Sequence, residues 1–259
     1  MTATWDPELY RSFDDHRSRP FHDLVARIGA PASGEGAPRR VVDAGCGPGH
    51  LTPMLARRWP DATVQAFDAS PEMVASARDN GVAADVVDVV DWIPSPGTDV
   101  VVSNAVLHWV PTHAELLTRW VQALSTGSWL AVQVPGNFEA PSHVLTREVA
   151  AQPRWRDRMS LRGAETVQDP AGYADLLTAA GADTDVWETT YLQRLAGDDP
   201  VLRWIGGTAL RPVRDALDDG EYAAFVDELG GRLRMAYPPS ADGTTWFPFR
   251  RIFAVARVR

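Results

Sequence analysis

The residues most suggestive of chemistry form a glycine-rich segment at positions 43–49, which reads Asp-Ala-Gly-Cys-Gly-Pro-Gly. Two valines precede this segment, and a stretch with helical character follows it. Glycines without a Cβ atom let the backbone approach a ligand closely, and the start of the following helix would offer free N–H groups. The pattern is typical of a nucleotide-type binding loop between a buried strand and a helix.

The spacing of the glycines narrows the choice of ligand. A dinucleotide-binding fingerprint needs its third glycine at position 50, where His50 stands. The carboxylate of Asp43 would oppose a pyrophosphate, but it would suit S-adenosylmethionine, which carries an ammonium and a sulfonium group. Charge and spacing therefore favour S-adenosylmethionine over NAD, while a bare G-x-G-x-G segment also fits a plain strand-to-helix turn.

Two more acidic residues follow the next predicted strands. Asp68 lies about 20 residues past the glycines, where a carboxylate is expected to accept hydrogen bonds from ribose hydroxyls. Asp88 lies beyond the third predicted strand, and we expect its carboxylate to accept from an adenine amino group, with the backbone of Val89 nearby. Together with the glycines, these acids predict a cofactor that contains a nucleoside.

The segment after the fourth predicted strand adds side chains at the same sheet edge, where open α/β folds bind their ligands. We expect Asn104 to face the reacting methyl group. Trp109 is either a wall of the cofactor site or a core aromatic residue. His108 is either a hydrogen-bonded wall residue or a general base.

Composition and charge argue against several classes of protein. The 259 residues are 45% hydrophobic, which suits one large α/β domain or a domain with a cap, and the net charge of −9 argues against a cationic nucleic-acid-binding face. A single cysteine and the lack of a His/Cys cluster argue against disulfides and a bound metal. The sequence shows neither an apolar signal segment nor a long apolar run, so we expect a cytoplasmic protein that acts on small molecules, without membrane partners. The oligomeric state stays open.

Lysine is absent, and all 25 basic residues are arginine. A Schiff base or a lysine general base is therefore impossible. Any anion has to be held by planar guanidinium groups, which can bind carboxylates in a bidentate manner.

The elements that position these residues alternate along the chain as short β-branched apolar runs and helical patterns, which is typical of a parallel sheet covered on both faces. The predicted strands comprise residues 41–44, 63–67, 83–87, 99–103, 129–134, 184–192 and 250–257. The predicted helices comprise residues 51–59, 71–80 and 112–124, and Ser70 and Pro71 are expected to cap and begin the second of them. Residues 198–235 read as mostly helical and form a candidate lid.

The chain is expected to have three parts. Residues 1–38 should form an N-terminal helical cap segment and a linker, and residues 39–136 the S-adenosylmethionine-binding core. Residues 137–259 should hold the remaining strands and a helical substrate-cap insert at about 193–246. Trp5, Tyr10 and Phe13 recur at helical spacing, which suits a packing stripe and also a helix that packs over the cofactor.

The glycine loop, Asp68, Asp88 and the Asn104 region resemble the class I S-adenosylmethionine-dependent methyltransferases. Later motifs resemble the subfamily of these enzymes that esterifies trans-aconitate. They include Trp5-x-Pro7-x-Leu9-Tyr10, Arg17-Ser18-Arg19-Pro20, Val132-Gln133-Val134-Pro135, Pro141-x-His143-Val144-Leu145, Arg147-Glu148-Val149-Ala150, Trp187-x-Thr189-Thr190-Tyr191, Leu210-Arg211-Pro212, Tyr237-Pro238 and Phe247-Pro248-Phe249-Arg250-Arg251. The resemblance implies an α/β fold with a doubly wound, Rossmann-like, seven-stranded sheet, an antiparallel last strand and a helical insert.

The resemblance also implies a reaction, in which the sulfonium methyl passes to one carboxylate of trans-aconitate and gives a monomethyl ester and S-adenosylhomocysteine. A carboxylate is already ionised at neutral pH, so no general base is needed, and catalysis would consist of in-line positioning in a dry cleft. The expected cofactor-binding residues are Arg19, Asp43, Gly45, Gly47, Asp68, Ala69, Met73, Asp88, Val89, Asn104 and Trp109.

A tricarboxylate inside an acidic protein demands local arginines and hydrogen-bond donors. The candidate substrate-binding residues are His143, Arg211, Tyr237, Arg250 and Arg251. Because side chains alternate along a strand, Arg250 and Arg251 should point to opposite faces, so only one of them should serve the site. Arg19 is a candidate for the substrate or for the carboxylate of the cofactor.

Other functions remain open at this point. Another small carboxylic acid or an acyl thioester could be the methyl acceptor. A non-catalytic regulator could bind S-adenosylmethionine and use the helical insert as a partner surface. An NAD-binding oxidoreductase is disfavoured by the glycine spacing and by Asp43.

Overall fold

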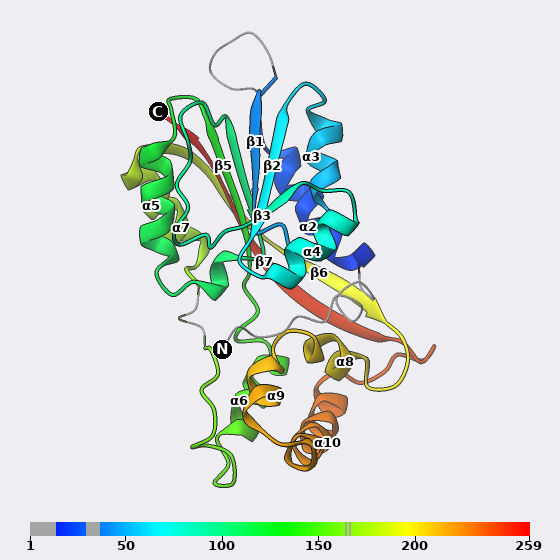
Figure 1. Cartoon of the computed structure of the whole chain (residues 1–259). Helices are drawn as coiled ribbons and strands as arrows, with labels where there is room; N and C mark the ends of the chain where they lie inside the picture. The colour runs from blue at the N-terminus through cyan, green and yellow to red at the C-terminus, as the bar shows by residue number, and fades with distance from the viewer. Residues whose placement is uncertain (1–13, 30–36, 164, 166) are drawn as a thin grey trace.

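Seven strands among the described residues form one mixed sheet in the order β3-β2-β1-β4-β5-β7-β6 (Figure 1). The computed structural model describes residues 14–29, 37–163, 165 and 167–259. The strands are β1 (Arg40–Ala44), β2 (Thr63–Asp68), β3 (Ala84–Val86), β4 (Val100–Asn104), β5 (Trp129–Pro135), β6 (Ala182–Leu195) and β7 (Thr245–Val258). Strands β1 to β5 are parallel, and β7 is antiparallel to β5 and β6. The predicted Rossmann-like fold with an antiparallel last strand is confirmed.

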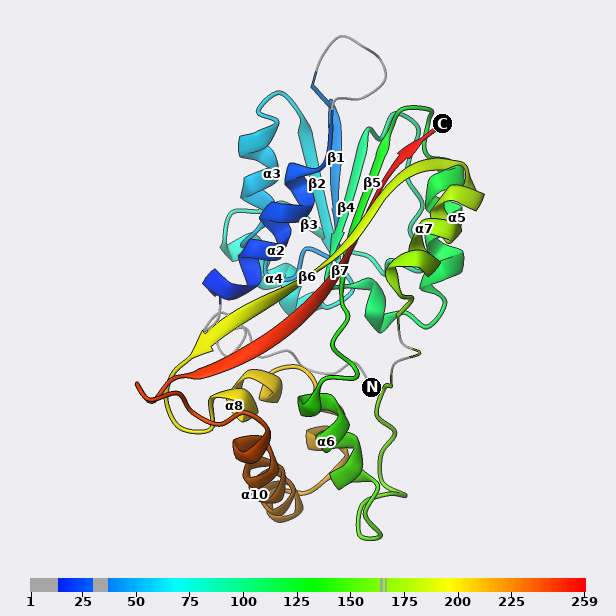
Figure 2. The ribbon, with the colours of Figure 1, turned by 180° about the vertical axis from the view of Figure 1, so that it is seen from behind.

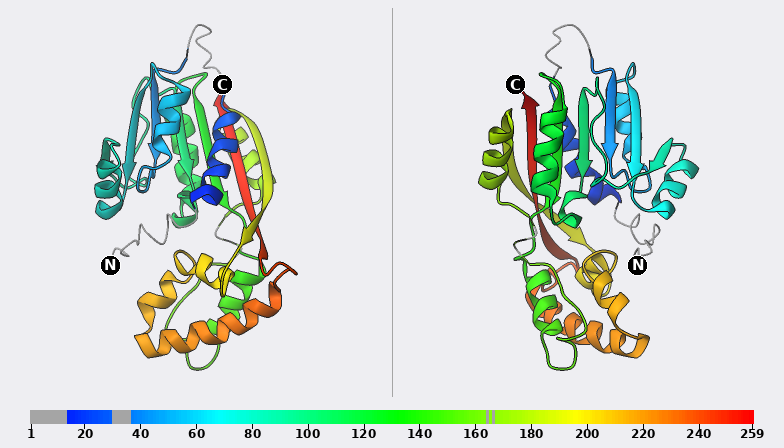
Figure 3. Two further views of the ribbon diagram at one scale, coloured as in Figure 1. Left: turned by 90° about the vertical axis from the view of Figure 1, so that its right-hand side faces the viewer. Right: turned by 60° about the vertical axis from the view of Figure 1, so that its left-hand side comes forward.

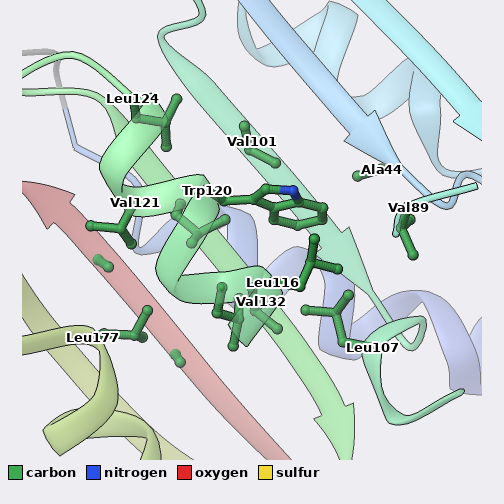
Figure 4. Packing of buried hydrophobic residues seen from close by; sticks show 14 of the residues in the cluster. Ala44, Val89, Val101, Leu107, Leu116, Trp120, Val121, Leu124, Val132 and Leu177 are labelled. Atoms are coloured by element: carbon green, nitrogen blue, oxygen red, sulfur yellow. The ribbon is translucent and has the colours of Figure 1, made fainter. Parts of the chain in front are cut away.

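Helices cover both faces of the sheet. They are α2 (Asp14–Ala26), α3 (Thr52–Arg58), α4 (Pro71–Asp79), α5 (His113–Ala123) and α7 (Pro170–Ala180). Neighbouring residues of a strand point to opposite faces, so Val100 and Val102 of β4 pack in the core beneath α2 and α3. Val101 points the other way and packs with Trp120 of α5 (Figure 4). The continuous apolar runs of the sequence thus reflect burial on both faces.

The helix α4 begins as the sequence predicts. Ser70 is its N-cap and accepts a hydrogen bond from the backbone N–H of Met73 at 3.2 Å. Pro71 occupies the first turn, where its missing N–H would have had no partner within the helix. This cap brings the start of α4 against the end of β2, next to the glycine loop.

Strands β6 and β7 are longer than predicted and continue beyond the sheet as a two-stranded ribbon (Figure 2). Their pairing runs from Ala182 opposite Val258 to Leu195 opposite Thr245. The first residues of β7 alternate between buried and exposed, and Pro248 lies among them, so the apolar signal is weaker there than at the buried positions that follow. The predicted strands, residues 184–192 and 250–257, therefore stop short of the outer end of this ribbon.

The ribbon leads to a second lobe of helices (Figure 3). These helices are α6 (Pro141–Ala150), α8 (Pro200–Gly206), α9 (Arg211–Ala216) and α10 (Asp219–Ala236). The lobe has its own core, in which Val149 of α6 joins Trp204, Phe225 and Phe247. Helix α6 comes before β6 in the sequence, so this helical lobe is built from two segments rather than from one insert. None of the described helices is long and apolar enough to span a membrane.

Candidate functional site

The glycine loop between β1 and α3 adopts a conformation that demands glycine. Gly45 has a φ of +83°, and a Cβ atom at this position would lie 2.3 Å from a methyl of Val106. The backbone N–H groups of Gly45 and Cys46 both donate to the carbonyl of Phe67 at 2.9 Å, which ties the loop to the end of β2. Backbone hydrogen bonds therefore attach the start of the loop to the sheet.

Asp68 fixes the same loop from the neighbouring strand. Its carboxylate accepts hydrogen bonds at 2.9 Å from the N–H groups of Gly47 and Ser70. Burial raises the pKa of Asp68, while these backbone donors oppose the shift. Each carboxylate oxygen can accept a second hydrogen bond, so the residue can hold the loop and still bind a hydroxyl donor.

Asp43 is the acidic residue of the glycine loop, and it is deeply buried. It is 3% exposed, and its carboxylate accepts a 2.6 Å hydrogen bond from the hydroxyl of Thr52. Burial raises the pKa of Asp43 to about 6, the hydrogen bond from Thr52 lowers it, and the nearby charge of Asp68 raises it further. A cationic ligand group would offset the unfavourable burial of this carboxylate.

These residues line a cavity of ≈ 610 Å³, which we call the loop cavity. Of the predicted cofactor-binding residues, the structure brings to this cavity Asp43, Gly45, Gly47, Asp68, Ala69, Met73, Asp88, Val89, Asn104 and Trp109. Arg19 lies apart from it on α2, where its guanidinium stacks 5.0 Å from the ring centroid of Tyr191. The predicted aromatic stripe of Trp5, Tyr10 and Phe13 lies outside the described residues.

A second cavity, of ≈ 140 Å³, lies between the sheet and the helical lobe, and we call it the arginine cavity. Its described lining includes Arg147, Arg162 and Arg251 together with His108 and His143, and it includes no aspartate or glutamate. Aromatic rings and threonine hydroxyls complete the wall; they belong to Trp109, Phe138, Thr146, Trp204, Thr208 and Phe249.

Several buried polar atoms of the arginine cavity have no hydrogen-bond partner among the described residues. They are both amide atoms of Asn137, Nδ1 of His108 and the amide oxygen of Asn104. Buried polar atoms in folded proteins are nearly always paired with protein, water or ligand. Their grouping around one cavity indicates a polar ligand.

Both histidines of the arginine cavity are neutral at physiological pH. Burial, together with the nearby Arg162 and Arg251, holds the pKa of His108 well below its usual value. Burial and the charge of Arg147 lower the pKa of His143 to about 4. The positive charge of the cavity therefore belongs to its guanidinium groups, while the imidazoles offer neutral hydrogen-bonding groups.

The two cavities meet at the carboxyl end of β4. Asn104, Ala105, Trp109, Arg162 and Pro212 line both of them. Ala105 has a left-handed φ of 57°, which is unusual for a residue with a side chain, and its N–H donates to the carbonyl of Gln133 at 2.8 Å. The chain thus turns sharply at this junction, and Asn104 lines both cavities.

The predicted substrate-binding residues divide into three groups. His143 and Arg251 line the arginine cavity, and Arg211 lines the loop cavity. Arg250 lies in neither cavity; it forms an ion pair with Glu188 and donates to the carbonyl of Gly136. Tyr237 also lies in neither, and its hydroxyl accepts a 3.0 Å hydrogen bond from the N–H of Ser142. The alternation along β7 that separates the two neighbouring arginines is therefore observed, and Arg251 is the one at a cavity.

Several lining residues of the arginine cavity were not among the candidates from sequence, including Asn137, Arg147 and Arg162. Asn137 lies two positions past the end of β5, so the rule that parallel sheets bind ligands at their strand ends could have found it. Arg147 lies on α6, and Arg162 lies in the loop between α6 and α7. Arg147 belongs to one of the subfamily motifs, which does not indicate its place in the fold, and no motif includes Arg162. Both reach the cavity through the docking of the helical lobe against the sheet.

Comparison with known proteins agrees with this geometry. Residues 13–184 match a family model described as a methyltransferase domain. The chain is 56% identical over 258 residues to trans-aconitate 2-methyltransferase of Rhodococcus jostii, covering 98% of this chain and 100% of that protein. It is 55% identical over 257 residues to the protein of the same name from Mycobacterium tuberculosis, covering 98% and 97%.

Solved structures with low sequence identity share the fold. Phosphoethanolamine N-methyltransferase 2 of Haemonchus contortus, in complex with S-adenosyl-L-methionine, superposes with a TM-score of 0.55 at 16% identity, covering 93% of this chain and 53% of that chain. The plantazolicin methyltransferase BpumL, in complex with SAH, gives a TM-score of 0.52 at 14% identity, covering 98% and 90%.

Proposed function

The chain belongs to the family of the trans-aconitate 2-methyltransferases, and from this premise we propose that it transfers the methyl group of S-adenosylmethionine to one carboxylate of trans-aconitate. The products are a monomethyl ester and S-adenosylhomocysteine. The reaction makes one ester C–O bond and breaks one C–S bond, whose electron pair stays on sulfur.

The observation that carries the proposal is the charge of the arginine cavity. A protein with a net charge of −9 places three arginines and no described acid around one small cavity, which opens onto the glycine loop at Asn104. Guanidinium groups match carboxylates in charge and in planar geometry. A small polycarboxylate is therefore the substrate class that this cavity suits best.

The loop cavity fits the cofactor. Its acids match the cofactor group by group: Asp43 suits the ammonium, Asp68 the ribose hydroxyls and Asp88 the adenine amino group. Gly45 and Gly47 leave the backbone accessible on the cavity wall. When bound, S-adenosylmethionine supplies an electrophilic methyl carbon.

The residues of the arginine cavity then have to position rather than to deprotonate. The acceptor carboxylate is already ionised, and His108 and His143 are neutral, so no proton has to move. Arginine side chains orient the acid, while Trp109, Phe138 and Phe249 exclude water from the reacting groups. Such positioning can lower a barrier by up to roughly 7 to 11 kcal/mol.

The test is incubation of the purified protein with methyl-labelled S-adenosylmethionine and one acid at a time: trans-aconitate, cis-aconitate, citrate, or crotonate as a monocarboxylate control. Mass spectrometry then measures the base-labile labelled ester. We expect ester chiefly from trans-aconitate and none from crotonate. If no acid is esterified while S-adenosylhomocysteine still binds, the substrate assignment is wrong although the methyltransferase fold stands.

A further inference from the structure

Arg162 occupies a position that no other described arginine shares, because it is the one that lines both cavities. It lies in the loop between α6 and α7, which in Figure 1 rises from the helical lobe to α7 beside the sheet. Its hydrogen bond to the carbonyl of His108 places it just past the end of β4. A charged group at the junction of two ligand cavities lies where a group has to pass from one ligand to the other.

The contacts of Arg162 hold its guanidinium firmly without neutralising it. The guanidinium stacks 3.7 Å from the ring centroid of Trp109, and Nη1 donates a 2.9 Å hydrogen bond to the carbonyl of His108. No carboxylate forms an ion pair with it among the described residues. Burial lowers the pKa of Arg162, so an anion in the junction would offset the cost of burying its charge.

The other two arginines of the arginine cavity have different surroundings. Arg147 forms a 2.9 Å ion pair with Glu139, and it donates to the carbonyls of Phe138 and Arg162 at 2.7 and 3.3 Å. It therefore braces the backbone of Arg162. Arg251 is 8% exposed, stacks on Phe249 and reaches Gln133, away from the loop cavity.

We propose that Arg162 holds the carboxylate that receives the methyl group, whereas Arg251 holds a carboxylate that does not react. The proposal rests on the function proposed above and adds a division of roles within its substrate site. One oxygen of the acceptor carboxylate accepts from the guanidinium, and the other faces the loop cavity. That oxygen forms the new bond to the methyl carbon as the C–S bond breaks and its electron pair passes to sulfur, and no proton is transferred.

This division predicts different kinetic defects for the two arginines. Loss of Arg162 removes orientation of the reacting group, so it lowers kcat on every acid that the enzyme accepts. Loss of Arg251 removes binding of a non-reacting carboxylate, so it raises KM while kcat changes little. The second defect should disappear when the substrate itself lacks that carboxylate.

The experiment measures kcat and KM for trans-aconitate in Arg162→Gln, Arg162→Lys and the control Arg156→Gln. Arg156 is in the same loop but is exposed and lines neither cavity, so its variant removes an equal charge from the same segment. For Arg162→Gln we expect kcat to fall by about 100-fold, as for loss of a donor to the reacting group. Arg162→Lys should recover part of this loss, because it keeps the charge but not the two-pronged geometry.

Two further measurements separate a binding role from a structural one. Thermal unfolding of Arg162→Gln should be as cooperative as that of wild type and Arg156→Gln if Arg162 acts on the substrate rather than on the fold. Added guanidinium ion should raise the kcat of Arg162→Gln and leave that of Arg156→Gln unchanged.

Two outcomes would overturn the assignment. One is an unchanged kcat in Arg162→Gln, with or without a rise in KM, and the other is a loss of activity that neither guanidinium nor lysine relieves. Failure of the proposed function itself would look different, because the wild-type protein would then form no ester from any acid.

Discussion

The loop cavity and the arginine cavity share a wall but differ in charge and in construction. The loop cavity is lined by Asp43, Asp68, Asp88 and Asp215, and the arginine cavity by arginines and no described acid. The wall of the first includes the glycine loop, whereas the second has long side chains from the helical lobe and from β7. Each charge suits the opposite charge of the proposed ligand, so the enzyme brings a cationic donor and an anionic acceptor together at Asn104.

The need for glycine in the wall of the loop cavity can be tested by adding a single methyl group at Gly45. Gly45→Ala would force a side chain into a φ of +83° and within 2.3 Å of Val106. Left-handed strain and overpacking together should destabilise the protein by about 4 kcal/mol and abolish cofactor binding. Thermal unfolding and calorimetric titration with S-adenosylhomocysteine measure both effects.

Gly47→Ala is the matched control for this substitution. Gly47 also has a positive φ of +55°, but a Cβ atom there would meet no atom within 4 Å. We expect a loss of stability of only about 1 to 2 kcal/mol. Equal losses in the two variants would contradict the view that contact with Val106 fixes the shape of the loop.

The guanidinium groups of the arginine cavity predict a large rise in KM when one of them is replaced by a neutral side chain. Arg251→Gln should raise KM for trans-aconitate by about 100-fold, because a buried guanidinium partner of a carboxylate is lost. Affinity for S-adenosylhomocysteine should stay unchanged, since Arg251 does not line the loop cavity. Steady-state kinetics and calorimetry provide the two measurements.

The neighbouring residue supplies the control for Arg251. Arg250 pairs with Glu188 at the surface and lines neither cavity, so Arg250→Gln should change KM by less than about threefold. A similar rise in KM in both variants would mean that net charge, rather than the position of the guanidinium, governs substrate binding.

The smallest expected effect concerns Asp43 and pH. Its pKa of about 6 is above its ordinary value of 3.8, so its contribution to stability declines as pH rises from about 4 to about 6. A cationic ligand favours the ionised form, so affinity for S-adenosylhomocysteine should rise with pH across the range around pH 6. Asp43→Asn should remove this pH dependence and weaken binding at pH 8 by about tenfold.

Calorimetry in buffers of different ionisation enthalpy measures the proton released on binding. Wild type should release a proton near pH 6, and Asp43→Asn should not. The same pH slope in both proteins would exclude Asp43 as the partner of the ammonium group.

The success of sequence reasoning differed between the cavities for a physical reason. Asp43 is the penultimate residue of β1, and Asp68 and Asn104 are the last residues of β2 and β4. The carboxyl ends of parallel strands meet at one edge of a sheet. The proximity of these three residues in space can therefore be predicted from local sequence patterns. Arg250 and Tyr237 carried the same kind of subfamily signal as Arg251, yet the structure brings only Arg251 to a cavity.

The sequence by itself determined the alternation of strands and helices, the glycine loop and the acidic residues at the strand ends, because local periodicity and residue type mark each of them. The tertiary structure alone decided which arginines meet. Arg147, Arg162 and Arg251 come from α6, a loop and β7, and they converge because β7 pairs with β5 and the helical lobe docks below the sheet. The order of strand pairing and the docking of the lobe are long-range packing outcomes. Residue periodicity marks each element but does not indicate which distant element it packs against.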